Sequence, residues 1–297
     1  MNFQGLAVAL VTPFDAQGAV DEAGLRRVVR HVVAGGVDVL VALGSTGEAA
    51  TLVDEERDQV IRVCLAEAQG RPVVVGTGSN STRQTEVWTR RAQELGAAGA
   101  LVVTPFYNKP TPEGLLAHYA AVAAAAPGLP LILYNVPGRT GLNVSPTTLQ
   151  RLWENPQVVA VKESSGNMAQ IGEIARCLPP GKLLLSGDDN LALPSIAVGA
   201  AGLVSVLGNA LPAQTRALVE AGRAGRREAA LSWHQALLPL MDALFLESNP
   251  IPLKALMEQL GLCGAGVRLP LVPAKPETRQ RLAEALRPVR ERDPRQV

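Results

Sequence analysis

A lysine ends one of the apolar runs of this chain. The run Val158–Val161 is followed directly by Lys162. Only five of the 28 lysines and arginines are lysines, so arginine supplies most of the positive charge. Arginine keeps its proton in proteins, whereas lysine can lose it, and a neutral amine attacks carbonyl carbons. A Schiff-base lysine is therefore our working hypothesis, although the run alone favours a strand-end lysine that points into water.

Two of the three tyrosines, Tyr107 and Tyr134, follow or end apolar runs of strand length. A tyrosine hydroxyl can donate and accept a proton during a reaction. Ser45 follows another such run and can connect the two tyrosines, so these three residues form a candidate proton relay. The alternative for any one tyrosine is a core residue with a satisfied hydroxyl, which we expect for Tyr119 in its alanine-rich stretch.

Two glycine-containing loops offer groups for binding anions. Arg139 lies in a loop after an apolar run and suits bidentate binding of a substrate carboxylate; alternatively it is a loop arginine in water. The loop Gly44–Gly47 can be a phosphate-binding turn, but it lacks the spacing of a phosphate-binding loop. A simple connection between a strand and a helix is therefore favoured for it.

The sequence gives no pattern of metal ligands. Asp188 and Asp189 can be read as a metal-binding or acid–base pair, but we favour a helix N-cap before residues 191–198. His31, His118 and His234 fall in helical stretches and are expected to be structural. We therefore predict that the protein holds no metal.

Composition limits the class of protein. The 297 residues are 47% hydrophobic with a net charge of +1, which gives no electrostatic reason to propose nucleic acid or an anionic membrane as a partner. Three scattered cysteines argue against disulfides and a zinc site. The start of the chain lacks the pattern of a signal peptide, and no apolar run reaches the roughly 20 residues of a membrane helix. We expect a soluble, cytoplasmic protein.

Short apolar runs alternate with amphipathic or alanine-rich segments along most of the chain. Strands are predicted at residues 6–11, 37–43, 72–77, 100–104, 131–134, 158–162, 183–186 and 202–206. Helices are predicted between them, for example at 22–34, 54–69, 82–95, 113–126 and 212–222. Such alternation implies parallel strands joined by right-handed crossovers. A (β/α)8 TIM barrel is favoured over a doubly wound open sheet.

Residues after about 225 show no further strand pattern. Helices are predicted at 229–246, 252–260 and 277–287, with proline-rich joints between them. The predicted organisation is a barrel domain over residues 1–224 and a C-terminal helical domain over residues 225–297. In a barrel of this kind chemistry collects at the C-terminal ends of the strands, which is where Ser45, Tyr107, Tyr134, Arg139 and Lys162 fall.

The sequence resembles the dihydrodipicolinate synthase family, within the pyruvate-dependent class I aldolases that also include N-acetylneuraminate lyase. The resemblance covers nearly the whole chain. Its segments are GSTGEAATL (44–52), VTPFYNKP (103–110), LYNVPGRTG (133–141), VKESSGN (161–167), SGDDNLALP (186–194), GLVSV (202–206) and ESNPIPLKALMEQLGL (247–262).

The resemblance implies a role for each candidate residue. Lys162 would form the Schiff base with pyruvate, so no separate cofactor is needed. Tyr134, Ser45 and Tyr107 would relay protons, with Tyr107 reaching in from a neighbouring subunit of a homotetramer. Three positions would contact pyruvate, namely Thr46, Gly187 and the backbone of Val204. Arg139 would hold the carboxylate of aspartate semialdehyde, and ring closure would give the heterocycle of the lysine and diaminopimelate pathway.

Two departures from the family pattern affect the interpretation. Ser45 stands where the synthase more often has threonine and neuraminate lyase has serine, so a 2-keto-3-deoxy-sugar or neuraminate-type aldolase stays an alternative. Arg139 favours an aldehyde with a carboxylate. A non-catalytic small-molecule-binding barrel is the remote alternative.

The second departure concerns feedback by lysine. In lysine-inhibited relatives, histidine, histidine, glutamate and tyrosine tend to stand at the positions of Asp54, Arg57, Gln84 and Phe106, whereas Asn80 is retained. Losing an acidic partner for the lysine ammonium weakens binding. We therefore predict weak or absent inhibition by lysine.

Overall fold

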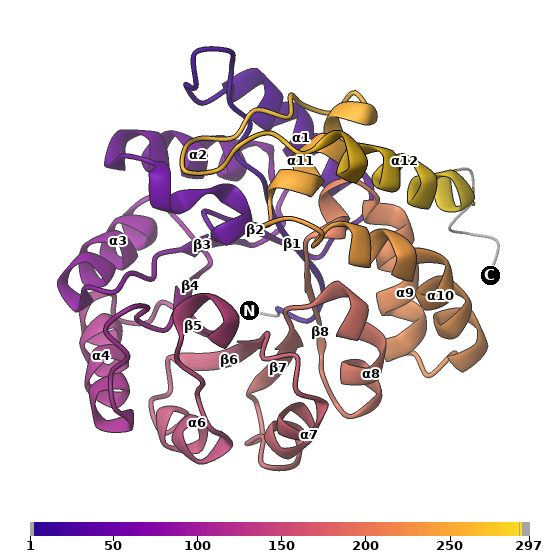
Figure 1. Cartoon of the computed structure of the whole chain (residues 1–297). Helices are drawn as coiled ribbons and strands as arrows, with labels where there is room; N and C mark the ends of the chain where they lie inside the picture. The colour runs from indigo at the N-terminus through magenta and orange to yellow at the C-terminus, as the bar shows by residue number, and fades with distance from the viewer. Residues whose placement is uncertain (1–2, 291, 293–297) are drawn as a thin grey trace.

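Eight parallel strands form a closed barrel in the order β1 to β8, with β8 paired to β1 (Figure 1). The computed structural model describes residues 3–290 and 292. The strands are β1 (Gly5–Ala9), β2 (Val39–Ala42), β3 (Val73–Gly76), β4 (Gly99–Val103), β5 (Leu131–Asn135), β6 (Val158–Glu163), β7 (Leu183–Ser186) and β8 (Gly202–Ser205). The predicted barrel is confirmed, and the doubly wound alternative is wrong.

Side chains alternate between the two faces of each strand, as the geometry of a β-strand requires. On β5 and β6, Ile132, Tyr134 and Ala160 face the interior of the barrel. Leu133 and Val161 face the surrounding helices. A strand with both faces buried is apolar throughout, which is why these strands could be found as continuous apolar runs.

Helices surround the barrel (Figure 1). They are α1 (Glu22–Ala34), α2 (Asp54–Glu67), α3 (Thr82–Glu94), α4 (Pro112–Ala125), α5 (Pro137–Thr140), α6 (Pro146–Leu152), α7 (Met168–Arg176), α8 (Ala192–Ala197) and α9 (Pro212–Arg223). The Ser81 and Ser145 side chains accept hydrogen bonds from the first turns of α3 and α6, and α3 begins where the sequence indicated. The four-residue α5 was not predicted, because it spans barely one turn.

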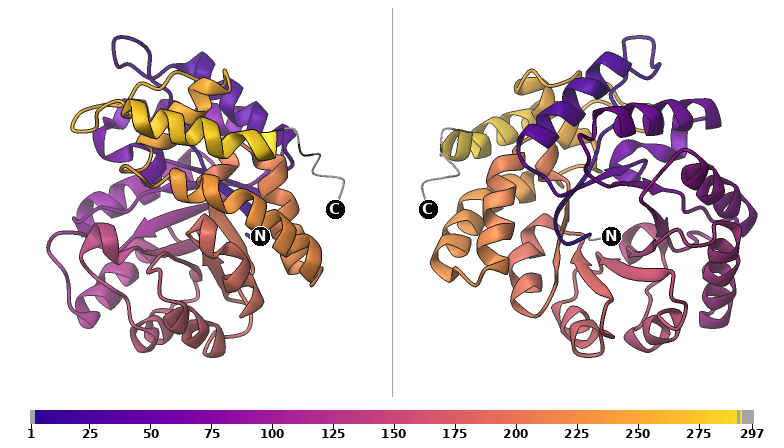
Figure 2. Two further views of the ribbon diagram at one scale, coloured as in Figure 1. Left: turned by 45° about the vertical axis from the view of Figure 1, so that its right-hand side comes forward. Right: turned by 180° about the vertical axis from the view of Figure 1, so that it is seen from behind.

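Three further helices follow the barrel: α10 (Arg227–Ala243), α11 (Ile251–Gln259) and α12 (Pro276–Arg290). In both views of Figure 2 these orange and yellow segments lie against one side of the barrel, beside the indigo start of the chain. Their buried residues share one hydrophobic cluster with α1, α2 and α9. The division into domains at residues 224 and 225 stays a prediction.

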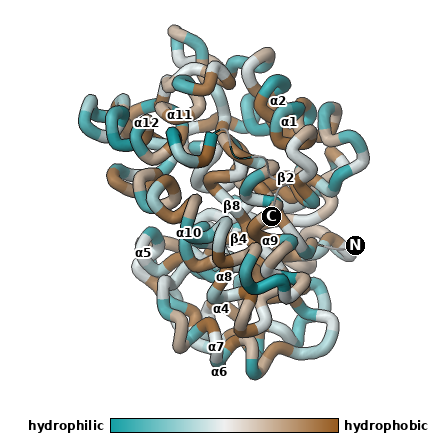
Figure 3. Tube along the Cα trace, turned by 90° about the vertical axis from the view of Figure 1, so that its right-hand side faces the viewer, coloured by the Kyte–Doolittle hydropathy of each residue, from teal (hydrophilic) through white to brown (hydrophobic). Residues whose placement is uncertain are grey.

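Hydrophobic and hydrophilic residues alternate along the helices around the barrel (Figure 3). Amphipathic helices of this kind bury one face and expose the other. Within the described residues, no helix has both the length and the apolar character needed to cross a membrane.

His118 on α4 gives a prediction about pH and stability. Its side chain is buried, its Nδ1 lies 2.9 Å from Thr82 Oγ1, and burial lowers its pKa to about 4. Unfolding exposes the imidazole, whose pKa then returns to about 6.5. Between those values the unfolded chain binds the extra proton, so this stabilising contribution is complete above about pH 6.5 and is lost towards pH 4. We expect a loss of about 3 kcal/mol of unfolding free energy from this residue.

Urea unfolding at pH 7 and pH 4.5 measures that loss. His118→Gln cannot gain a proton in this range, so the difference between its two unfolding free energies should be smaller than in the wild type. An equal difference in both proteins would contradict the assignment to His118.

Candidate active site

Lys162 lies inside the barrel, near the C-terminal end of β6. It is 4% exposed, so the interpretation as a strand-end lysine in water is wrong. The register between β5 and β6 shifts after Leu131, and beyond this irregularity Tyr134 pairs with Lys162. Lys162 Nζ lies 4.1 Å from the centroid of the Tyr134 ring. The irregularity thus places a candidate nucleophile against a candidate proton carrier.

Gly187 provides the space in which the Lys162 side chain lies. A Cβ atom at this position would be 1.9 Å from Ser164 Oγ and 2.9 Å from Lys162 Cε. Any side chain at residue 187 would therefore displace Lys162 or Ser164. Val204 is buried on the neighbouring strand β8, in the same interior cluster as Tyr134.

A cavity of about 530 Å³ opens at this end of the barrel. Ser45 lines it from the loop after β2, and Tyr134 and Arg139 line it from β5 and the short helix α5 that follows. Gly44 and Phe106 line the same cavity. The cavity brings together one predicted proton carrier from β5, one from the loop after β2, and the predicted carboxylate-binding arginine.

Asn249 was not recognised from the sequence, although it lies in one of the segments on which the resemblance rests. Its Nδ2 donates a hydrogen bond of 2.8 Å to Thr46 Oγ1, and its backbone oxygen accepts one of 3.0 Å from Arg139 Nη2. These contacts join residues 203 and 110 positions apart in the sequence. Asn249 therefore links two predicted substrate-binding residues, and no local sequence pattern signals such a link.

Tyr107 is not brought into the cavity of its own chain. Its side chain is 88% exposed, and its φ of 73° lies in the left-handed region that bulky residues seldom adopt. Leu43, at the end of β2, has a φ of 58°. Strained backbone of this kind persists where surrounding structure enforces it, often at functional sites.

The predicted N-cap role of Asp188 and Asp189 is wrong. Neither side chain caps the short helices that follow. The buried Asp189 carboxylate instead accepts hydrogen bonds from the Ser205 hydroxyl and from the backbone N–H groups of Val206 and Leu207. Asp188 lies near Lys162; burial raises its pKa to about 6, although the Lys162 charge acts in the opposite direction.

The described residues contain no group of three or more histidine, cysteine, aspartate or glutamate side chains that could hold a metal ion. The loop Gly44–Gly47 forms a short 3-10 turn over Ser45–Gly47.

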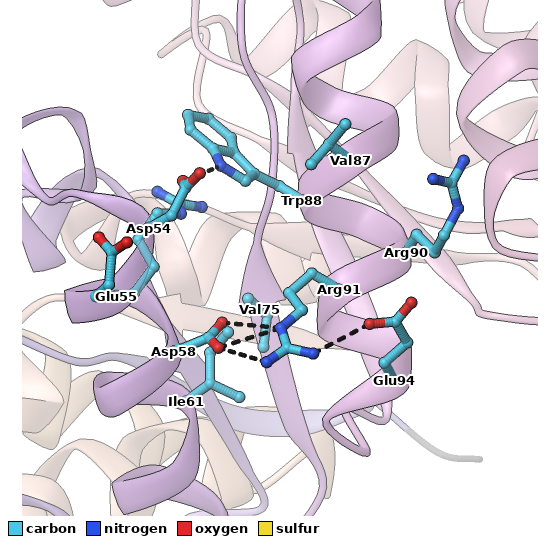
Figure 4. A pocket seen from close by; sticks show the side chains of 11 residues that line it. Asp54, Glu55, Asp58, Ile61, Val75, Val87, Trp88, Arg90, Arg91 and Glu94 are labelled. Atoms are coloured by element: carbon cyan, nitrogen blue, oxygen red, sulfur yellow. Dashed lines mark hydrogen bonds and ion pairs between the residues drawn. The ribbon is translucent and has the colours of Figure 1, made fainter.

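A second pocket lies beside the cavity and shares Arg57 and Trp88 with it. Figure 4 shows the Trp88 indole directed at Asp54; its Nε1 donates a hydrogen bond of 2.8 Å to Asp54 Oδ1. The Arg57 guanidinium lies 3.9 Å from the Trp88 ring centroid and donates to the backbone oxygens of Ala49 and Gly76. Burial lowers the pKa of Arg57 to about 10, so Arg57 stays charged at neutral pH.

Comparisons with known proteins identify the family of this chain. The model of the dihydrodipicolinate synthetase family matches residues 2–288. The 4-hydroxy-tetrahydrodipicolinate synthase of Geotalea daltonii is 46% identical over 286 residues, which cover 96% of this chain and 98% of that protein. The crystal structure of dihydrodipicolinate synthase from Aquifex aeolicus has a TM-score of 0.93 and 41% identity, covering 96% of this chain and 97% of its own.

The chloride-inhibited dihydrodipicolinate synthase of Acinetobacter baumannii, whose structure holds pyruvate, has a TM-score of 0.94 and 41% identity, covering 97% of this chain and 99% of its own. A family match over almost the entire length and high identity to a full-length relative lead to the same assignment. The chain therefore belongs to the dihydrodipicolinate synthetase family.

Proposed function

We propose that the protein is a 4-hydroxy-tetrahydrodipicolinate synthase that condenses pyruvate with L-aspartate 4-semialdehyde. The observation that carries this proposal is the buried Lys162, positioned under the Tyr134 ring in the space left by Gly187. Membership of the family and the pyruvate held by the Acinetobacter baumannii relative support pyruvate as the first substrate.

In the proposed reaction the neutral Lys162 amine attacks the keto carbon of pyruvate, and water leaves to give an iminium. Loss of a methyl proton converts the iminium to an enamine, whose carbon attacks the aldehyde of the second substrate. The amino group of that substrate then closes the ring and releases Lys162. Tyr134 and Ser45 line the cavity and move protons in these steps.

Tyr107 completes the proposed relay from a neighbouring copy of the chain. Its side chain is 88% exposed and is not among the residues that line the cavity of its own chain, so it is accessible to a second copy. The proposed assembly is a homotetramer, with at least a dimer needed for this exchange. The proposed setting is the cytoplasm, and the reaction uses no cofactor besides the covalent link to Lys162.

Thr46, Gly187 and the Val204 backbone contact pyruvate in this proposal, and Arg139 binds the carboxylate of the aldehyde. Arg139 is already oriented by the Asn249 carbonyl, which leaves its other N–H groups for a substrate carboxylate. The aldehyde substrate of a neuraminate-type aldolase is a neutral sugar without a carboxylate. Arg139 in the cavity favours the charged aldehyde over the sugar.

A two-step experiment tests the function. The protein is first incubated with pyruvate and borohydride and its mass measured; a reduced adduct on Lys162 is expected, and its absence would exclude both aldolase hypotheses and leave a binding barrel. Turnover is then compared for aspartate semialdehyde and N-acetylmannosamine. Preference for the sugar would replace the synthase assignment with the neuraminate-type alternative.

Lysine should inhibit this enzyme weakly or not at all. At the positions where lysine-inhibited relatives tend to have two histidines and a glutamate, this chain has Asp54, Arg57 and Gln84. The Arg57 guanidinium lies against Trp88 there, and a second cation would meet its positive charge. Gln84 is neutral, so the charged hydrogen bond that a glutamate would make to the lysine ammonium is absent. Its loss weakens the binding of lysine by about 1.5–3 kcal/mol.

Initial rates at increasing lysine concentration measure this effect. An inhibition constant well below millimolar in the wild type would contradict the prediction. Gln84→Glu restores an acidic partner and should increase the sensitivity to lysine, whereas Gln93→Glu, on the same helix, should leave it unchanged.

A further inference from the structure

Lys254 on α11 is a second buried lysine, and the proposed reaction does not use it. Its side chain and that of Glu48 are 0% and 2% exposed. Lys254 Nζ lies 2.5 Å from Glu48 Oε1 and donates a hydrogen bond of 2.7 Å to the Gly266 carbonyl. It also lies 4.1 Å from the centroid of the Phe14 ring. A buried lysine is rare unless it is paired or has a function.

Glu48 lies at the turn point of the loop after β2. Its φ of 52° places it in the left-handed region, where it separates two 3-10 turns, Ser45–Gly47 and Ala49–Thr51. A residue with a side chain is strained there and keeps this conformation only when its surroundings enforce it. The second carboxylate oxygen of Glu48 accepts a hydrogen bond of 3.0 Å from the Arg268 N–H. Both oxygens are therefore held by the C-terminal segment.

The turn that Glu48 ends contains two residues of the proposed site. Ser45 and Thr46 precede Glu48 by three and two positions, within one short 3-10 turn. On its other side this turn is fixed by the Thr12 hydroxyl, which donates a hydrogen bond of 2.7 Å to the Gly47 carbonyl. Asn249 donates to Thr46 itself. Residues 249–268 thus hold the catalytic loop at Thr46 and again at Glu48.

We infer that Glu48 and Lys254 are positioning residues, which set the orientation of Ser45 and Thr46 and through them the binding of pyruvate. The inference rests on the proposed function of Ser45 and Thr46. If Ser45 and Thr46 act as proposed, the segment after the barrel contributes to the reaction by holding the loop after β2 in place. The pair does not touch the reacting atoms.

A buried ion pair contributes little net stability, because the desolvation of both charges offsets their attraction. Replacing both partners by neutral residues of similar size is therefore often tolerated, whereas removing one charge leaves the other unpaired. The double variant Glu48→Gln/Lys254→Met should consequently unfold near the wild-type midpoint. In contrast, the left-handed backbone conformation of residue 48 loses the ion pair with Lys254 that holds it.

The readout is the pyruvate concentration that gives half-maximal borohydride trapping on Lys162. It should rise roughly tenfold to a hundredfold in the double variant, because small displacements of positioning groups have effects of that size. The trapped lysine should remain Lys162, which lies on β6. The matched control makes the corresponding substitutions in the exposed pair Glu173 and Arg176, as Glu173→Gln/Arg176→Met, and should trap like the wild type.

A folded double variant with wild-type half-saturation would overturn the inference. Glu48→Gln alone keeps the shape of the side chain and serves as a second variant with the same readout. If neither variant folds, the inference is also wrong, because the pair would then determine folding rather than loop position. Trapping needs no aldehyde, so failure of the wild type to condense aspartate semialdehyde would count only against the proposed function.

Discussion

Lys162→Ala should abolish the covalent adduct with pyruvate, and with it all turnover. No other described lysine lies against Tyr134 inside the barrel, so no other amine can take its place. Lys162→Arg should fail as well, because a guanidinium keeps its proton and is not a nucleophile. Intact-protein mass after treatment with pyruvate and borohydride gives the result directly.

Lys182 provides the matched control. It is a partly buried lysine, but its Nζ donates to the backbone carbonyls of Asn155, Pro156 and Val158. Lys182→Ala should keep the adduct. An unchanged adduct in Lys162→Ala would show that the Schiff base forms elsewhere, and the site as described would be wrong.

Gly187→Ala should slow adduct formation by roughly a hundredfold or more, the scale of effect expected when a reacting group is displaced by about 1 Å. The new Cβ would lie 1.9 Å from Ser164 Oγ and 2.9 Å from Lys162 Cε, distances at which atoms cannot remain. Ser164 or Lys162 must then shift, and a shift of Lys162 changes its position under Tyr134. The rate of borohydride-trapped adduct formation measures the effect.

Two further variants test why Gly187→Ala slows adduct formation. Gly172→Ala places the same methyl group on α7, where nothing lies within 4 Å, and should leave the rate unchanged. Adding Ser164→Ala to Gly187→Ala removes the closer contact and should restore part of the rate. If Gly187→Ala traps pyruvate as fast as the wild type, the close packing around Lys162 has no functional importance.

The barrel and the position of Lys162 could be predicted because both follow from local patterns. Buried parallel strands are apolar throughout, and polar residues at their C-terminal ends meet at one face of a barrel. A lysine that interrupts such a pattern is visible in the sequence. The same rule identified Tyr134 and Ser45, which line the cavity.

Asn249 and the pair Glu48–Lys254 could not be predicted in this way. Their contacts span more than 200 residues, from the C-terminal segment to the loop after β2. Only the packing of α11 on the barrel brings them together. The N-cap role expected for Asp189 failed for a similar reason, because its carboxylate binds the end of β8 instead of its own helix. Local propensity cannot rank such competing long-range partners.

The two attachments of the loop after β2, at Thr46 and at Glu48, have a consequence for synthesis on the ribosome. Glu48 is made early, but its partners Lys254 and Arg268 follow 206 and 220 residues later. At about 5–20 residues per second, the loop waits roughly 10–40 s for them. During that interval its two 3-10 turns lack the contacts that hold Glu48 in the left-handed region. Under the inferred role of Glu48 and Lys254, the emerging chain closes most of its barrel before the loop is held, and the site becomes competent only after residues 254–268 have been made.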